Sequence, residues 1–204
     1  MKTYTINPKT TALLIIDAQR EYFDADKPLF TPNAAKIRDN LIKLKAYAEE
    51  KSIPTVIIEH MHRADGGDVG RMGDFDPTPV FTEGTDGCET IAELSSPKDI
   101  HVRKTRYSAF VNTKLESLLK SWGVDTVIIT GLMTNFCSVT TARHAHDLDY
   151  KVIFVIDANA GPDMPDVGYG AIPHGDIMKV IATTLACGVA DIATTSEIIS
   201  QRKS

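Results

Sequence analysis

Cys137 lies at the junction between a predicted strand and a predicted helix, a position at which a cysteine thiol can become reactive. Residues 125–130 are a short β-branched apolar run, and residues 138–148 carry apolar positions at helical spacing. The first turn of a helix presents free N–H groups and the positive end of the helix dipole, which favour an anion. A thiol there would ionise more readily than a free cysteine, and the same amides could hold an oxyanion. The alternative is a small, inert thiol packed between helix and sheet.

Three other residues with acid–base chemistry end or follow apolar runs of this kind: Asp17, His60 and Lys104. In a parallel sheet the carboxyl ends of the strands share one edge, and ligand sites form there. We therefore predict that the carboxylate of Asp17, the ammonium of Lys104 and the thiol of Cys137 converge. Singly, Asp17 could be a turn cap, Lys104 a solvated strand end and Cys137 a packing residue. Three such groups at one edge favour a functional site.

The elements that must position these groups alternate along the chain. Helices are predicted to begin at Thr31-Pro32, with Thr31 as the N-cap, and after Asn112 as a cap, and to cover residues 138–148 and 177–185. The pattern predicts a single α/β domain over residues 1–204, with a doubly wound, mainly parallel six-stranded sheet and helices on both faces. Two irregular loops are expected, at residues 60–96 and 161–175. The six strands are predicted at residues 11–17, 54–59, 99–104, 125–130, 151–157 and 191–195.

Composition narrows the class of protein. The 204 residues carry a net charge of -5 without a Lys/Arg-rich run, so we expect no nucleic-acid partner. No apolar run is long enough to span a membrane, and residues 1–10 lack the apolar segment of a signal peptide. Three widely spaced cysteines argue against a disulfide framework and for a reducing compartment. We expect a cytoplasmic globular protein.

Four blocks in order resemble the isochorismatase-like cysteine hydrolases, a superfamily that includes nicotinamidases, N-carbamoylsarcosine amidohydrolases, and biuret and ureidoacrylate hydrolases. The first block carries Asp17, Gln19 and Phe23, and the second carries Lys104 and Phe110. The Cys137 block, with its G-x-x-T-N-x-C turn, is the most specific of the four. The blocks read LLIIDAQREYF, VRKTRYSAF, GLMTNFCSVTTARHA and KVIFVIDANAG.

The resemblance implies a catalytic triad of Asp17, Lys104 and Cys137. In that reading, Lys104 lowers the pKa of the thiol, Asp17 takes its proton, and the sulfur attacks an amide, carbamoyl or ureido carbonyl. Asp17 then protonates the leaving nitrogen and later activates water to hydrolyse the thioester. The expected activity is that of a cysteine-dependent amidohydrolase on a small molecule.

The family also implies a cis peptide at Leu132–Met133, with an oxyanion hole formed by the N–H groups of Met133 and Cys137. Small polar substrates are expected in a pocket near the ends of the predicted strands. The residues assigned to it are Gln19, Phe23, His60, Arg106, Tyr107 and Phe110.

The sequence departs from the nicotinamidases at their metal site. Those enzymes carry Asp-x-His after the second strand and a further histidine, whereas this chain has His60-Met61-His62 and no later histidine before Cys88. Residues two apart on an extended chain point to opposite faces. We therefore expect no metal and no cofactor, and His60 is either a substrate contact or a solvated turn residue. The resemblance further implies a homodimer or homotetramer.

Three other readings stay open at this point. An isochorismatase-type hydrolase would cleave a vinyl ether without relying on the cysteine. A catalytically silent member would bind a small ligand in the same pocket. A redox-responsive protein would oxidise Cys137. Asp17 and Lys104 argue against the last two, because a binder needs no acid–base partner. A thiol sensor usually has a resolving cysteine nearby, and the sequence leaves Cys88 and Cys187 open for that role.

Overall fold

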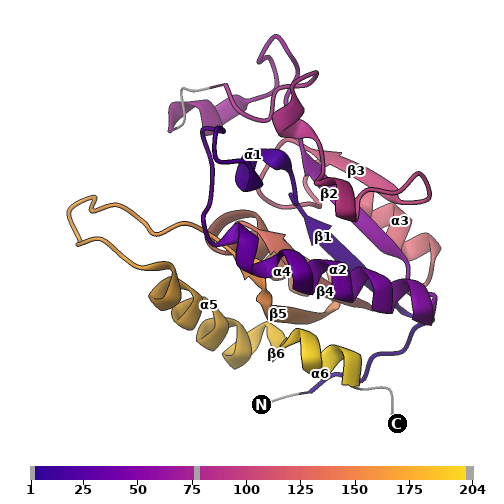
Figure 1. The fold of residues 1–204 in the computed structure, drawn as a ribbon. Helices are drawn as coiled ribbons and strands as arrows, with labels where there is room; N and C mark the ends of the chain where they lie inside the picture. The colour runs from indigo at the N-terminus through magenta and orange to yellow at the C-terminus, as the bar shows by residue number, and fades with distance from the viewer. Residues whose placement is uncertain (1–2, 76–78, 201–204) are drawn as a thin grey trace.

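One six-stranded, all-parallel sheet organises the molecule (Figure 1). The structure is a computed structural model that describes residues 3–75 and 79–200. The strand order is β3-β2-β1-β4-β5-β6, which confirms the predicted doubly wound sheet. The strands are β1 (Thr11–Ile16), β2 (Thr55–His60), β3 (Ile100–Lys104), β4 (Thr126–Leu132), β5 (Lys151–Ala160) and β6 (Ala190–Ala193).

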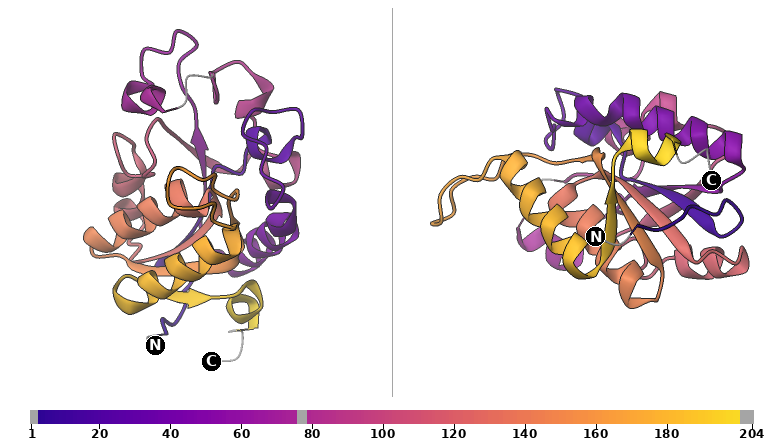
Figure 2. Two further views of the ribbon diagram at one scale, coloured as in Figure 1. Left: turned by 90° about the vertical axis from the view of Figure 1, so that its left-hand side faces the viewer. Right: turned by 90° about the horizontal axis from the view of Figure 1, so that it is seen from below.

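Helices cover both faces of the sheet. Helices α2 and α6 lie on one face, and α3, α4 and α5 lie on the other (Figure 2). The short helix α1 follows β1. None of the described helices is long and apolar enough to cross a lipid bilayer. The helices are α1 (Arg20–Phe23), α2 (Ala34–Lys51), α3 (Leu115–Ser121), α4 (Val139–Asp147), α5 (His174–Gly188) and α6 (Thr195–Ser200).

The central strands β1 and β4 are buried at every position, and their only polar side chains are Thr11, Thr126 and Thr130, because helices cover both faces of the sheet. In β1, Leu13 and Ile15 pack towards α2, whereas Leu14 and Ile16 pack towards α3 and α4. Side chains alternate between the two faces of a strand, so a strand between two helical layers has no polar face. The apolar run that predicted this strand therefore reflects the burial of both of its faces.

Two predicted helix starts are wrong. Helix α2 begins at Ala34 with Asn33 at the N-cap, and the Thr31 hydroxyl donates to the Leu29 carbonyl while the Thr31 carbonyl accepts from the Ala34 N–H in a preceding turn. Asn112 has a left-handed backbone with φ 56°, and α3 begins three residues later at Leu115. In both cases a turn precedes the helix and uses the residue that resembles a cap.

The strand order reverses between β1 and β4. These two strands are neighbours, with Ile16 opposite Gly131, and the chain leads away from them to opposite sides of the sheet. Loops that leave the carboxyl ends of such a pair diverge and open a crevice, which is where ligands bind in sheets of this kind. Both termini lie at the other end of the molecule (Figure 1).

Candidate active site

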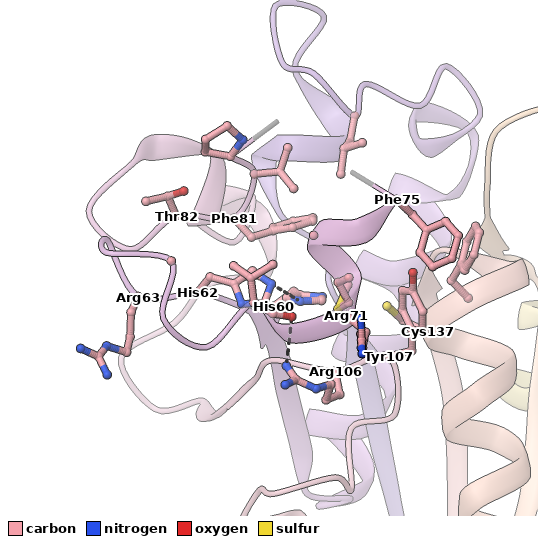
Figure 3. A pocket seen from close by; sticks show the side chains of 18 of the residues that line it. His60, His62, Arg63, Arg71, Phe75, Phe81, Thr82, Arg106, Tyr107 and Cys137 are labelled. Atoms are coloured by element: carbon pink, nitrogen blue, oxygen red, sulfur yellow. Dashed lines mark hydrogen bonds between the residues drawn. The ribbon is translucent and has the colours of Figure 1, made fainter. Parts of the chain in front are cut away.

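A cavity of about 970 Å³ opens above the carboxyl edge of the sheet, beside the reversal of strand order. Residues 60–75 and 79–82 contribute much of its wall, and Cys137 lies on its inner side (Figure 3). Its volume is at the upper end of the ~300–1,000 Å³ typical of small-molecule sites. The cavity is therefore large enough for a substrate and contains the predicted nucleophile.

The three predicted catalytic side chains meet beneath this cavity. The Lys104 ammonium lies 2.8 Å from Asp17 Oδ2 and 3.2 Å from Cys137 Sγ. All three residues are buried, with Asp17 at 0% and Lys104 at 1% exposure. A thiol, a carboxylate and an ammonium in mutual contact, next to an open cavity, can perform nucleophilic and acid–base chemistry.

Each of these side chains is positioned by a strand end. Asp17 directly follows β1 and has a left-handed backbone with φ 47°, a conformation that Asp tolerates better than most residues. Lys104 is the last residue of β3. Cys137 lies in a π-helical turn, Thr134–Ser138, between β4 and α4. Cys137 thus lies two residues before α4, in a π turn rather than in the first turn of an ordinary α-helix, and such π turns are frequent at functional sites.

The charges in this group favour an ion pair next to a neutral thiol. Burial raises the pKa of Asp17, although the Lys104 ammonium opposes the shift. Burial alone would lower the pKa of Lys104, but the Asp17 carboxylate and the Cys137 sulfur outweigh it and raise that pKa. Burial, followed by the charge of Asp17, raises the pKa of Cys137 to about 12. Lys104 lowers the pKa of the thiol, as expected, but burial and Asp17 outweigh it, so the expected net lowering of this pKa is wrong for the resting site.

A chain of hydrogen-bonding groups leads from Lys104 to the cavity wall. His60 Nδ1 lies 3.1 Å from Lys104 Nζ, and His60 Nε2 lies 3.0 Å from His62 Nε2. The ammonium can only donate, so His60 Nδ1 must accept and His60 Nε2 must carry the proton. The proton of His62 is then on Nδ1, which faces Asp68 Oδ1 at 3.3 Å. Burial and the Lys104 charge hold the pKa of His60 well below its usual value, which agrees with a neutral ring.

The rings of His60 and His62 face each other, whereas the sequence spacing predicted that they would point to opposite faces of the chain. The reason is that β2 ends at His60, so the alternation of a strand does not extend to His62. His62 instead forms a bridge to Thr82 and has only 5% of its surface exposed. Side-chain direction beyond a strand end is set by tertiary contacts, which sequence spacing does not report.

The buried donors of the site do not fit a metal ion. Ligand atoms of Asp17, His60 and Cys137 all lie within 4.8 Å of one another, and these residue types can bind metals. However, Lys104 Nζ lies within 3.2 Å of each of the three atoms concerned. The ammonium therefore already supplies the cation that this donor set would attract.

The peptide bond Leu132–Met133 is cis. It joins the last residue of β4 to the π-helical turn, and Met133 and Cys137 both line the cavity. The Met133 carbonyl accepts hydrogen bonds from the N–H groups of Phe136 and Ser138, which closes the turn around the cysteine. The two residues predicted to form an oxyanion hole thus lie in the same tight turn.

Only half of the residues predicted to contact substrate line the cavity. His60, Arg106 and Tyr107 do so. Gln19 is fully buried, and its side-chain amide donates to the carbonyls of His60 and Cys88 and accepts from the His60 N–H. Gln19 therefore fixes the end of β2 and is not among the described residues that line the cavity.

Phe23 and Phe110 also lie outside the described cavity lining. Phe23 packs against the α2 side of the core, with the Arg38 guanidinium 5.6 Å above its ring. Phe110 lies in the core on the other face, where its ring stacks on Tyr150. An aromatic residue near a catalytic block can serve either the core or the site, and the block alone does not distinguish them.

Sequence reasoning missed most of the cavity wall. Among the missed residues, Phe81 stacks on the His60 ring with 5.0 Å between ring centroids, and the rings of Phe136 and Tyr107 have centroids 5.2 Å apart. Val69, Met72 and Phe75 come from the segment that reads as a Gly- and Asp-rich loop. The available signal was the presence of large apolar residues in a polar loop without periodicity.

Comparisons with known proteins identify the family and the fold. Residues 11–170 match the family model of the isochorismatase domain. Nicotinamidase 3 of Arabidopsis thaliana is 34% identical over 157 residues, which cover 76% of this chain and 75% of that protein. The structure of a cysteine hydrolase from Pseudomonas syringae pv. phaseolicola 1448A aligns with a TM-score of 0.95 and 35% identity, covering 98% of this chain and 95% of that one. N-carbamoylsarcosine amidase from Thermoplasma acidophilum aligns with a TM-score of 0.73 and 27% identity, covering 91% and 96%.

Proposed function

This chain belongs to the isochorismatase-like cysteine hydrolase superfamily, and we propose that it hydrolyses a C–N bond of an amide, carbamoyl or ureido compound through a thioester on Cys137. A nicotinamidase and an amidase among its relatives support this bond type. The observation that carries the proposal is the contact of Lys104 Nζ with both Asp17 Oδ2 and Cys137 Sγ at the base of the cavity.

The first step is transfer of the Cys137 proton to Asp17. Before the transfer the buried group holds one carboxylate, one ammonium and a neutral thiol. After the transfer it holds a neutral carboxylic acid, the same ammonium and a thiolate. The net charge of the buried group does not change, so the step avoids the cost of charging a dry site. This explains how a thiol whose pKa is raised to about 12 can still react when a carbonyl is bound.

The thiolate then attacks the substrate carbonyl, and the N–H groups of Met133 and Cys137 stabilise the oxyanion. Asp17 returns its proton to the nitrogen as the C–N bond breaks, which releases ammonia or an amine and leaves a thioester. Asp17 next removes a proton from water, which attacks the thioester, and the departing sulfur regains a proton as thiol. Lys104 stays protonated throughout and balances whichever neighbour is negative.

The test is ammonia release from a panel of primary amides and ureido compounds, after dialysis of the protein against a chelator. The panel includes nicotinamide, N-carbamoyl amino acids, biuret, maleamate and simple alkyl and aryl amides. Wild type is expected to turn over at least one compound, and Cys137→Ala to lose about 10³-fold or more of that activity. Cys187→Ala, which changes an exposed thiol on α5, serves as the matched control and is expected to retain it.

Other outcomes would reject specific parts of the proposal. Ammonia release that survives Cys137→Ala would indicate C–N hydrolysis without the thiol and would reject the thioester step. Loss of activity on chelation alone would indicate a metal and contradict the assignment of the cation role to Lys104. Absence of turnover on the whole panel, combined with tight binding of a panel compound, would indicate a silent ligand-binding member.

A further inference from the structure

The cavity above Cys137 has a largely apolar wall, although the bond that the site is proposed to cleave is polar. Most of its lining side chains are aliphatic or aromatic, contributed mainly by the loop after β2, the loop before α2, the segment after β3 and the turn after β4. Phe136 precedes the nucleophile directly, and its ring contacts Tyr107 at 5.2 Å. Residues from four separate segments thus present carbon surface to one space. The most informative of them are Leu29, Met72, Phe75, Val80, Tyr107 and Phe136.

Two of these side chains are also exposed, which is costly unless a ligand covers them. Phe75 has 89% and Tyr107 has 36% of its surface accessible. Figure 3 shows both on the Cys137 side of the cavity. Large exposed apolar groups that border a cavity mark binding surfaces more often than accidents of folding. The rim of the cavity therefore presents apolar surface that a ligand in the cavity can contact.

The charges on the wall disfavour a cationic ligand. Asp65 is the one acidic residue among the described lining residues, and it is already paired with Arg63 and with the Gly67 N–H. Arg106 also lines the cavity, and its Nη1 donates to the Asp68 carbonyl at 2.8 Å. No described lining carboxylate is thus left to receive a positive group, and an uncompensated guanidinium would repel one.

We infer that the substrate is a carboxamide or ureide that carries an uncharged or anionic apolar body, aryl or alkyl, of several carbons. The inference rests on the proposed function, because it assumes that the reacting carbonyl lies at Cys137. The C–N bond then lies at the polar base and the body fills the apolar space above it. This differs from the small polar substrates that the sequence suggested.

The test is a matched series of amides with ammonia release as the readout. From acetamide through butyramide to heptanamide, kcat/KM should rise by about threefold to fourfold for each methylene that becomes buried. Heptanamide and its cationic counterpart 6-aminohexanamide have nearly equal length, and the cationic one should react at least about tenfold more slowly. Equal values along the series, or a preference for the cationic compound, would overturn the inference.

Variants of the wall locate the effect. Phe75→Ser removes an exposed ring, and Met72→Gln replaces an apolar side chain by a polar one of similar size. Each should lower kcat/KM for heptanamide about tenfold and change the value for acetamide less than twofold. The matched control is Phe30→Ser, because Phe30 is an exposed aromatic residue outside the described cavity lining. If all three variants behave alike, the wall does not select the substrate.

A binding measurement separates failure of this inference from failure of the proposed function. Cys137→Ala should be stabilised against heat by heptanamide and not by acetamide at the same concentration. Stabilisation by heptanamide without any hydrolysis by wild type would reject the C–N hydrolase and leave the apolar site intact. Hydrolysis of acetamide as fast as heptanamide, with no stabilisation by either, would keep the hydrolase and reject the apolar substrate.

Discussion

The thiol of Cys137 shares a buried space with one carboxylate and one ammonium, so the location of its proton depends on which of them dominates. Asp17 opposes formation of a thiolate, and Lys104 favours it. Burial is the largest cause that raises the pKa of the thiol, and together with Asp17 it raises this pKa to about 12. The free protein is therefore expected to hold a neutral thiol at physiological pH, unlike hydrolases whose cysteine is already ionised.

Alkylation of Cys137 by iodoacetamide reads this pKa directly. In wild type the rate should rise with pH up to at least about pH 10 without a plateau, because only the thiolate reacts. Asp17→Asn removes the charge that opposes ionisation and leaves Lys104 without its carboxylate. The variant should therefore alkylate about tenfold or more faster at pH 8, while its hydrolytic activity is lost for want of a proton acceptor.

The measurement follows the Cys137 peptide by mass spectrometry, so that Cys88 and Cys187 do not contribute. Slower alkylation in Asp17→Asn would contradict this account, because it would mean that Asp17 already withdraws the proton in the free protein. A wild-type plateau near neutral pH would contradict it as well. Either result would restore the low-pKa thiol that the sequence suggested.

At the scale of elements, the approach of β1 to β4 determines how close the acid lies to the nucleophile. Gly131 lies opposite Ile16, one residue before Asp17 is reached on the neighbouring strand. Its φ is 113°, and a Cβ at this position would overlap the backbone oxygen of Ile16. Only glycine lets the two backbones come this close without displacement.

Gly131→Ala is expected to lower the free energy of unfolding by roughly 3 kcal/mol or more, because the obstacle is backbone and not a mobile side chain. The control is Gly123→Ala, which also has a positive φ of 68° but has nothing within 4 Å of the added methyl. That variant should lose only about 1 kcal/mol from backbone strain. Urea denaturation measures both, and equal losses would show that β1 and β4 do not constrain each other here.

Element types were largely predictable from the sequence because the strands are buried on both faces. The runs that form β1 and β4 are largely apolar, with β-branched residues and no charged residue, and that pattern is typical of a central strand. The end of β5 was not predictable. It continues to Ala160 because Asn159 and Ala160 pair with β4 after a shift in register. The polar sequence there does not read as a strand, and the partner strand supplies the reason.

The same division holds for the candidate site. Asp17, Lys104 and Cys137 follow predicted strands, and the topology of a parallel sheet brings such positions to one edge. Gln19 could not be assigned correctly, because its hydrogen bonds join residues 41 and 69 positions away in the chain. The apolar cavity wall was equally hidden, since its residues come from a loop whose path follows no local periodicity.

At the scale of the whole molecule, exposed apolar surface is concentrated away from the cavity as well as in it. Of seven large hydrophobic side chains exposed in the described part of the chain, four lie on α5 or on the segment before it. Tyr169 has 92% and Val180 has 61% of its surface exposed. This segment projects from the body of the molecule and leads directly into α5 (Figure 1). The four are Val167, Tyr169, Ile172 and Val180.

We propose that a second copy of the chain covers this surface in a homodimer or homotetramer. Light scattering after gel filtration should give a multiple of the mass of 22.3 kDa. Val180→Asp should shift the distribution towards monomer, because a buried unpaired charge at an interface is costly. Ser117→Asp adds the same charge to an exposed position on α3 and should leave the mass unchanged. A monomeric wild type would reject the proposal.

The dependence of stability on pH belongs to the whole molecule, because folding holds His60 neutral within the network that fixes Lys104. The pKa of His60 is well below 6.5 in the folded chain, mainly through burial and then through Lys104. Below about pH 6.5 the unfolded chain binds a proton at His60 that the folded chain does not. Since the unfolded state then binds more protons, the free energy of unfolding falls as pH falls. The limit is about 1.4 kcal/mol per pH unit for each such group.

Calorimetry between pH 7 and pH 5.5 should therefore show a falling Tm in wild type and a shallower fall in His60→Gln. The comparison of slopes isolates His60 from Asp17, whose raised pKa acts in the opposite direction, because the folded state then holds the extra proton. A loss of 1 kcal/mol corresponds to about 2–4 °C for a chain of this size. Parallel slopes would mean that His60 binds its proton in the folded state. In that case His60 Nδ1 could not accept from Lys104, and the proton order from Lys104 through His60 to His62 and Asp68 would have to be reversed.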